Sequence, residues 1–127
     1  MAASIVIMVG DEEFAAQLSD ERSPETVRRI LAALPIQAQA SRWGDEFYFA
    51  IPVEMAEENA VAQVSIGDLG YWPEGSCFCI FYGRTPMSRS DAAIIPASAV
   101  NLIGAIESPE RLRAHKAGET VTIRPAL

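Results

Sequence analysis

Short stretches of alternating apolar and polar residues, each bounded by turn-forming residues, constrain the fold of this chain more than any other feature. Alternation with a period of two places successive side chains on opposite faces of an extended chain, which predicts half-buried β-strands. About seven or eight strands of this kind are expected, at residues 4–9, 13–18, 36–41, 46–51, 62–66, 77–82, 99–106 and 119–124. Many short strands with few helices favour a closed or nearly closed antiparallel barrel, because closure removes exposed sheet edges.

Two pairs of neighbouring strands are predicted to form hairpins. Residues 4–9 and 13–18 flank a turn at Gly10, and residues 36–41 and 46–51 flank a turn that contains Gly44. Residues 67–75 mix turn formers with Tyr71 and Trp72, so we interpret them as a loop that leads into the buried strand at 77–82.

One long helix is predicted over residues 24–34, where Ser23 offers a capping hydroxyl and Pro24 occupies the first helical position. Its apolar side chains recur at i, i+3, i+4 and i+7, and they are Val27, Ile30, Leu31 and Leu34. We expect this whole stripe to pack across one end of the barrel. A short C-terminal helix is predicted to begin after Ser108 and to close at Gly118.

Length and charge limit the kinds of protein this chain can be. A chain of 127 residues with 50% hydrophobic content fits one domain, which we place at residues 1–127. The net charge of −7 disfavours nucleic acid as a partner, because a phosphate backbone would be repelled. No apolar run approaches the ~20 residues of a membrane span, and no basic residue precedes the apolar run at 5–9 as in a secretory signal. The chain is therefore expected to be cytoplasmic, with no membrane partner.

The sequence predicts neither a metal site nor a cofactor. Cys77 and Cys79 stand two apart in a strand and share one face, so we expect reduced thiols in the core and no disulfide between them. His115 lies between Arg113 and Lys116 and is interpreted as a solvated cation or as a cation at a helix end.

A cluster of acidic residues in the segment 52–59 has two interpretations. Glu54, Glu57 and Glu58 have no clear period, which is typical of a solvated loop. Three carboxylates can also bind calcium, but the Asp/Asn–Gly spacing of a calcium loop is missing.

Several segments carry a resemblance to known families. Residues 14–18, 23–27 and 47–52 resemble the opening strand, first helix and following strand of cyclophilins. A more extensive resemblance links residues 42–46, 67–73, 78–88 and 95–101 to small prokaryotic cyclophilin-like proteins of uncharacterised function. The resemblance implies a mainly β, cyclophilin-like barrel whose open end is plugged by a helix. It implies no particular reaction.

The resemblance also indicates why prolyl isomerase activity is not expected. Cyclophilins use an Arg that stabilises the twisted amide electrostatically. Phe49 occupies the matching position, and a phenyl ring cannot donate a hydrogen bond. Cys77 stands where cyclophilins have a Gln, and the thiols at Cys77 and Cys79 have no predictable base beside them, so no catalytic residue is assigned.

The function predicted is non-catalytic binding of a small molecule or an extended peptide in a cleft of mixed apolar and polar character. The expected ligand contacts are Phe49, Tyr71, Trp72, Phe78, Arg84, Thr85 and Met87, with Arg84 and Thr85 as polar anchors. Trp43 and Trp72 have an alternative interpretation as half-buried lids on the barrel. Other open functions are a weak prolyl isomerase, an enzyme acting on amides or lactams, and an interaction protein that pairs through a barrel edge. The oligomeric state expected is a monomer or a homodimer.

Overall fold

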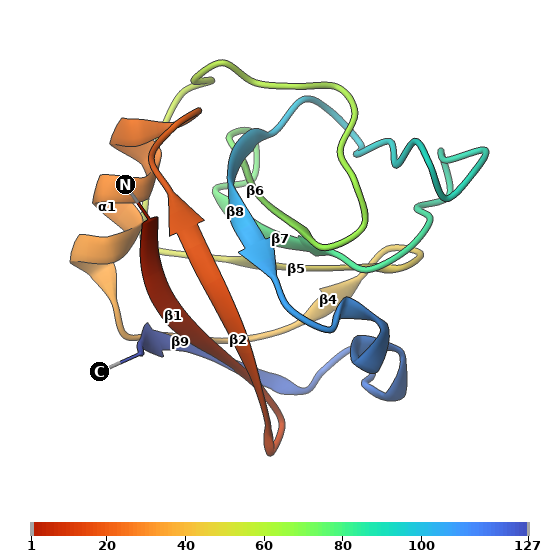
Figure 1. Ribbon diagram of the computed structural model, residues 1–127, viewed down its shortest axis with the longest axis horizontal. Coiled ribbons are helices and arrows are strands. Elements are labelled where there is room, and N and C mark those ends of the chain that lie inside the picture. Colours follow the sequence, from red (N-terminus) through yellow and green to blue (C-terminus); the bar gives the residue numbers. More distant parts are fainter. Residues whose placement is uncertain (1, 127) are drawn as a thin grey trace.

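The computed structural model describes residues 2–126, which form nine strands, one α-helix and one 3₁₀ helix (Figure 1). The strands are β1 (Ala2–Val9), β2 (Glu12–Ser19), β3 (Ile36–Gln39), β4 (Ser41–Arg42), β5 (Glu46–Ala50), β6 (Asp68–Trp72), β7 (Cys77–Phe81), β8 (Asn101–Ile106) and β9 (Thr120–Pro125). The helices are α1 (Pro24–Ala33) and η1 (Pro109–Ala114). Within residues 2–126, neither helix has the length and apolar character that crossing a membrane requires.

All nine strands belong to one antiparallel sheet with the order β3-β9-β1-β2-β8-β6-β7-β5-β4. The two outermost strands, β3 and β4, are consecutive in the chain, and only Ala40 separates them. The backbone N–H of Ala40 donates to the carbonyl of Glu119 at 2.9 Å, and its own carbonyl accepts from the N–H of Gly118 at 2.7 Å. The two edges of the sheet therefore meet in one continuous stretch of chain. This confirms the prediction of a nearly closed, mainly β barrel.

The first predicted hairpin is confirmed, and the second is half wrong. β1 pairs with β2 from Ala2↔Ser19 to Val9↔Glu12 around the turn at Gly10, whose φ is +58°. In the second hairpin only β4 pairs with β5, whereas β3 pairs with β9. The alternation in residues 36–41 predicts extended chain correctly, but it carries no information on the partner. The strand changes partner at Ala40.

Side chains from alternate strand positions fill the barrel, and the largest of them are aromatic. Phe14, Phe47, Phe78 and Tyr71 are fully buried there. The α1 helix lies against the barrel beside β1 and β2 (Figure 1). It contributes side chains from its own buried face to the same core.

One residue of the predicted helix stripe is not buried. Val27 and Ile30 lie in the core, and Leu34 is partly buried against it. Leu31, in contrast, is 37% exposed, so the prediction that it packs across the barrel end is wrong. Successive helical residues are turned by about 100°, and Ile30 already occupies the centre of the contact. Leu31 is therefore turned to the edge of the narrow face that touches the barrel.

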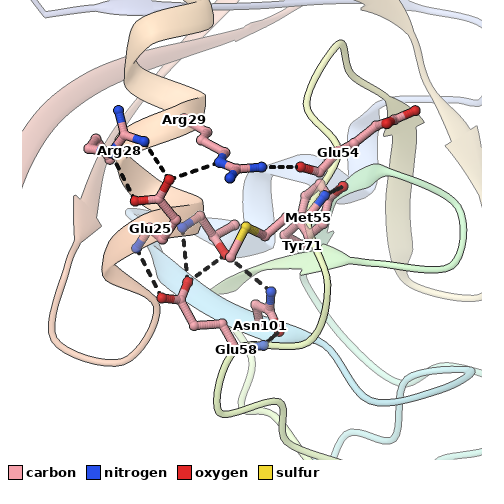
Figure 2. Close-up of polar contacts among 9 residues, drawn as sticks. Glu25, Arg28, Arg29, Glu54, Met55, Glu58, Tyr71 and Asn101 are labelled. Atoms are coloured by element: carbon pink, nitrogen blue, oxygen red, sulfur yellow. Dashed lines mark hydrogen bonds and ion pairs between the residues drawn. The ribbon is translucent and has the colours of Figure 1, made fainter.

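The N-terminus of α1 is capped by a residue far away in the chain (Figure 2). Ser23 makes no side-chain cap. Instead, the Glu58 carboxylate accepts hydrogen bonds from the backbone N–H groups of Glu25 at 3.0 Å and Thr26 at 2.9 Å. Burial acts to raise the pKa of Glu58, but its bonds to the Thr26 and Glu25 backbone and the Thr26 hydroxyl lower the pKa overall. The Asn101 amide oxygen accepts from the Glu58 backbone N–H at 2.8 Å, which ties the same residue to β8.

The acidic segment 52–59 is thus a loop that is anchored at Glu58, which neither the solvated-loop nor the calcium interpretation predicts. No group of three or more His, Cys, Asp or Glu side chains within residues 2–126 is placed to hold a metal ion. Cys77 and Cys79 are free and buried, as predicted.

Residues 62–66 are not a strand, and the predicted loop at 67–75 contains one. The first segment makes only one isolated bridge, Val64↔Ile94, while β6 occupies residues 68–72. The turn signals from the glycines are overridden because Leu69 and Tyr71 fill the barrel. The segments before β6 and β8 instead cover the outer face of the sheet. There Val64, Ile94 and Val100 of these segments pack with three residues of β7 in a second apolar cluster. The β7 residues are Cys77, Cys79 and Phe81.

His115 lies at a helix end, as one of the two sequence interpretations has it, but it is not solvated. It ends η1 with a side chain only 12% exposed, and its Nε2 and Nδ1 lie 2.8 Å and 2.9 Å from carboxylate oxygens of Glu12 and Glu119. Burial acts to lower the pKa of His115, but the hydrogen bonds to Glu119 and Glu12 raise it overall. The solvated interpretation is wrong because Glu12, from the other end of the chain, lies against the ring together with Glu119.

Candidate functional site

A pocket of about 210 Å³ opens on the outer face of the sheet, where β6, β7 and β5 lie side by side. Its lining residues are Trp43, Glu46, Tyr48, Trp72, Cys79, Pro96, Ala97, Ser98 and Val100. The strands supply the wall and floor, and the loop before β8 supplies the facing wall. The pocket combines three aromatic rings with one carboxyl group.

Two larger hollows, of about 250 and 360 Å³, lie along β2 and β8. Their linings contain no aromatic side chain. Small-molecule sites commonly combine apolar or aromatic walls with a few placed polar groups. We therefore regard the smaller, aromatic pocket as the candidate site.

The alternation of β5 explains how the pocket acquires its polar and aromatic groups. Phe47 and Phe49 point into the barrel, so Glu46 and Tyr48 point outward. The pairing of β5 with β7 then sets Tyr48 directly beside Cys79. One strand thus builds the barrel core with one face and the pocket with the other.

Trp72 is held in place from two sides. Its indole N–H donates a 2.6 Å hydrogen bond to the hydroxyl of Ser98, across the pocket from the strand. On the other side the ring lies over Gly75, where an added Cβ would sit 2.6 Å from the ring atom Cζ3. Any larger residue at position 75 would displace the ring. The wall formed by Trp72 is therefore preorganised.

Trp43 reaches the pocket from the turn between β4 and β5. Its backbone N–H donates to the Glu46 carbonyl at 2.9 Å, and the Glu46 N–H donates back at 3.2 Å. Gly44 makes this tight turn possible, because its φ of +61° lies in the left-handed region. The turn places the Trp43 ring and the Glu46 carboxyl in the same pocket.

Glu46 and Cys79 are ionisable groups of the site whose pKa values are raised by burial. Only 6% of Glu46 is exposed, and burial raises the pKa of its carboxyl to about 7, against a smaller lowering by a hydrogen bond with the Cys79 thiol. Burial and the nearby Glu46 carboxyl together raise the pKa of Cys79 well above its ordinary value. The thiol is therefore neutral near pH 7, while the carboxyl is divided between its two protonation states.

Three of the predicted ligand contacts lie in the barrel. Phe49 and Phe78 stack at a centroid distance of 5.5 Å inside the core. Tyr71 is also buried, and its hydroxyl donates to the Val53 carbonyl at 2.6 Å. The structure does not bring these three side chains into the pocket. They pack in the barrel core, on the face of the sheet opposite the pocket.

Three further predicted contacts lie in the long loop between β7 and β8, which projects from the barrel (Figure 1). Arg84 pairs with Asp91 at 2.9 Å, and Met87 is 53% exposed. Thr85 is buried and donates its backbone N–H to the Ser88 hydroxyl. None of the three lines the pocket, so contact of these three side chains with a ligand stays a prediction.

Trp72 is the one predicted contact that lines the pocket. Sequence reasoning missed Glu46 and Tyr48 as site residues and considered Trp43 mainly as a lid. The available signal was the alternation in residues 46–50, which places Glu46 and Tyr48 opposite the two phenylalanines. Ser98 gave no signal, because its role depends on the distant Trp72.

Comparison with known proteins agrees with this architecture. A family model described as cyclophilin-like matches residues 3–124, and the chain belongs to this family. The chain is also similar to a hypothetical protein from Archaeoglobus fulgidus with a known solution structure. The identity is 42%, the match covers 98% of this chain and 95% of the other, and the TM-score is 0.83. Comparison with curated proteins gave no match.

Proposed function

We propose that this protein is a small-molecule-binding module whose ligand occupies the pocket between Trp43, Glu46, Tyr48 and Trp72. The observation that carries the proposal is the convergence of three aromatic rings and one buried carboxyl on a single cavity. Aromatic walls supply buried apolar contact, and one polar group fixes the orientation of a ligand.

The size of the pocket favours a small ligand. Its volume of about 210 Å³ corresponds to roughly seven water molecules at ~30 Å³ each. A small metabolite, or one side chain of a larger partner, fits this space. An extended peptide would need a longer groove than the lining residues provide.

The chemistry of the pocket favours binding over covalent catalysis. The raised pKa of the Cys79 thiol keeps it protonated, so it is a poor nucleophile. His115, the one histidine of the sequence, pairs with Glu12 and Glu119 and does not line the pocket. The described lining therefore offers no cysteine thiolate at neutral pH.

An enzyme acting on amides or lactams is the second candidate. A single observation favours it: the pKa of Glu46 is about 7, which suits a general acid or base at neutral pH. This function requires turnover that disappears in Glu46→Gln. Binding without turnover favours the first candidate.

The test uses the two tryptophans of the sequence, both of which line the pocket. A fragment library is screened by intrinsic tryptophan fluorescence on wild type, Trp43→Phe and Trp72→Phe. Ligands of the pocket should change the wild-type emission and lose affinity in either variant. Met87→Ala is the matched control, because this exposed side chain lies outside the pocket. Fragments that bind all four proteins equally would place the ligand elsewhere.

A further inference from the structure

We propose that the pocket selects small organic cations, with an alkylammonium group held between the Trp43, Tyr48 and Trp72 rings and the Glu46 carboxylate. The inference rests on the proposed function, because it names the ligand class of the same pocket. Three separate features of the site support it.

The first feature is a carboxyl with no cationic partner. Within residues 2–126, no Arg, Lys or His side chain forms an ion pair with Glu46, although nine other ion pairs are present. The arginines of this region are already engaged, since Arg42 and Arg113 both pair with Asp45, at 3.2 and 2.9 Å. An ionised carboxylate at this depth requires a positive charge beside it, and a bound cation would supply it.

The second feature is the way in which the aromatic residues are presented. The indole N–H of Trp72 is occupied by Ser98, so a ligand meets the ring of Trp72 and not its donor. Tryptophan and tyrosine rings attract cations through their negative faces, and Trp does so most strongly. An anion would find no Arg or Lys in the described lining of the pocket.

The third feature is the electrostatic setting. The whole chain carries a net charge of −7, which favours the approach of cations over anions. The titratable groups that face Glu46 are the Cys77 and Cys79 thiols of β7 and the Tyr48 phenol of β5. Burial raises the pKa of both thiols, so at neutral pH they add no negative charge that could replace Glu46.

Cation binding should therefore be coupled to loss of a proton. Burial raises the pKa of Glu46 to about 7, so the carboxyl is mostly neutral at pH 5 and mostly ionised at pH 9. A cation binds the ionised form of the carboxyl, so binding is accompanied by release of the Glu46 proton. Affinity should rise about tenfold per pH unit between pH 5 and 6 and level off above about pH 8.

The experiment compares choline with its neutral isostere, 3,3-dimethylbutan-1-ol, by isothermal titration calorimetry. At pH 8.5 we expect choline to bind wild type at least about tenfold more tightly than the isostere. Glu46→Gln keeps the shape of the side chain but cannot ionise, so it should bring this ratio close to one. Glu74→Gln is the control, because it removes one negative charge from an exposed turn beside the pocket and should leave the ratio unchanged.

The pH dependence of wild type gives a second readout that needs no variant. Titrations at pH 6 in buffers with different ionisation enthalpies should reveal release of close to one proton per choline bound. Equal affinity for choline and the isostere, or choline binding that is independent of pH, would overturn the cation inference. If the isostere alone changes the tryptophan emission, the cation inference fails while the proposed small-molecule function stands.

Discussion

The indole N–H of Trp72 and the hydroxyl of Ser98 lie 2.6 Å apart, and this hydrogen bond joins β6 to the loop that covers the outer face of the sheet. The bond closes one side of the candidate pocket. It also fixes a ring that Gly75 supports from the other side. The shape of the pocket therefore depends on two small residues that themselves offer little to a ligand.

Ser98→Ala should loosen this wall. Loss of one neutral hydrogen bond typically costs about 1 kcal/mol of folding free energy, and we expect a loss of this size in urea denaturation. The indole N–H resonance of Trp72 should shift upfield at the same time. Ser65→Ala is the control, since Ser65 is exposed, and its effect should stay within about 0.5 kcal/mol. An unchanged indole resonance would contradict the assigned bond.

Glu46 should make the protein less stable as the pH rises. Burial raises its pKa from 4.5 to about 7, so the folded state binds the proton more tightly than the unfolded state. The stabilisation from this proton is complete below pH 4.5 and disappears as the pH rises through about 7. Its size is roughly 3 kcal/mol.

The measurement is the free energy of unfolding of wild type and Glu46→Gln between pH 4.5 and 8.5. Subtracting the two curves removes contributions common to both proteins, including that of His115, whose raised pKa acts in the same direction. The free energy of unfolding of wild type, relative to that of Glu46→Gln, should fall by roughly 3 kcal/mol as the pH rises over this range. A flat difference would show that the Glu46 carboxyl titrates at its ordinary pKa.

Glu58 should stabilise α1 from outside the helix. Glu58→Ala removes the acceptor for the N–H groups of Glu25 and Thr26, and we expect a cost of about 1–2 kcal/mol. Because the pKa of Glu58 is lowered on folding, this contribution is present above its ordinary pKa and is lost as the pH falls. Glu57→Ala is the matched control in the same loop, since Glu57 is exposed. Equal effects of the two variants in denaturant would exclude a specific cap.

The α1 helix offers a direct comparison between neighbouring residues. Ile30→Ala should cost about 2–5 kcal/mol, because Ile30 is completely buried in the barrel core. Leu31→Ala should cost less than about 1 kcal/mol, because Leu31 lies at the exposed edge of the helix. Chemical denaturation of both variants decides the point, and the reverse order of the two losses would mean that the helix docks through another face.

The protein should not catalyse prolyl isomerisation. Phe49 is buried and stacked on Phe78, and no Arg is part of the described pocket lining. A protease-coupled peptide assay with a cyclophilin as positive control should show only the uncatalysed rate. Turnover near that of the cyclophilin would refute this reasoning from the missing guanidinium donor.

Local patterns in the sequence predicted most of the strands but not all of their partners. Period-two alternation identifies β2 and β5 because one face of each is buried. The same pattern at residues 62–66 misleads, since only Val64 is buried there and its neighbours are exposed. β6 is not predicted because Gly67 before it and Gly70 within it resemble turn residues. Gly70, however, lies in the strand where the outer loop approaches closely, and an added Cβ would sit 3.1 Å from Val100.

The candidate site was harder to predict than the fold. The segment rich in aromatic residues indicated Trp72 correctly, because that side chain alternates outward from Tyr71. Glu46 looks like an ordinary residue at the start of a strand, and only the tertiary structure shows that it is buried in a pocket that the outer loop also lines. Pockets built between a strand and a distant loop leave no local pattern in the sequence.

The most direct test of the central claim follows the two indole N–H resonances in an amide correlation spectrum. Trp43 and Trp72 are the only tryptophans in the sequence, and both line the pocket. During titration with the ligands found by fluorescence, both resonances should shift with the same saturation curve, and resonances along β2 and β8 should not move. Binding that moves β2 and β8 and leaves both indoles unchanged would contradict the assignment of the pocket as the functional site.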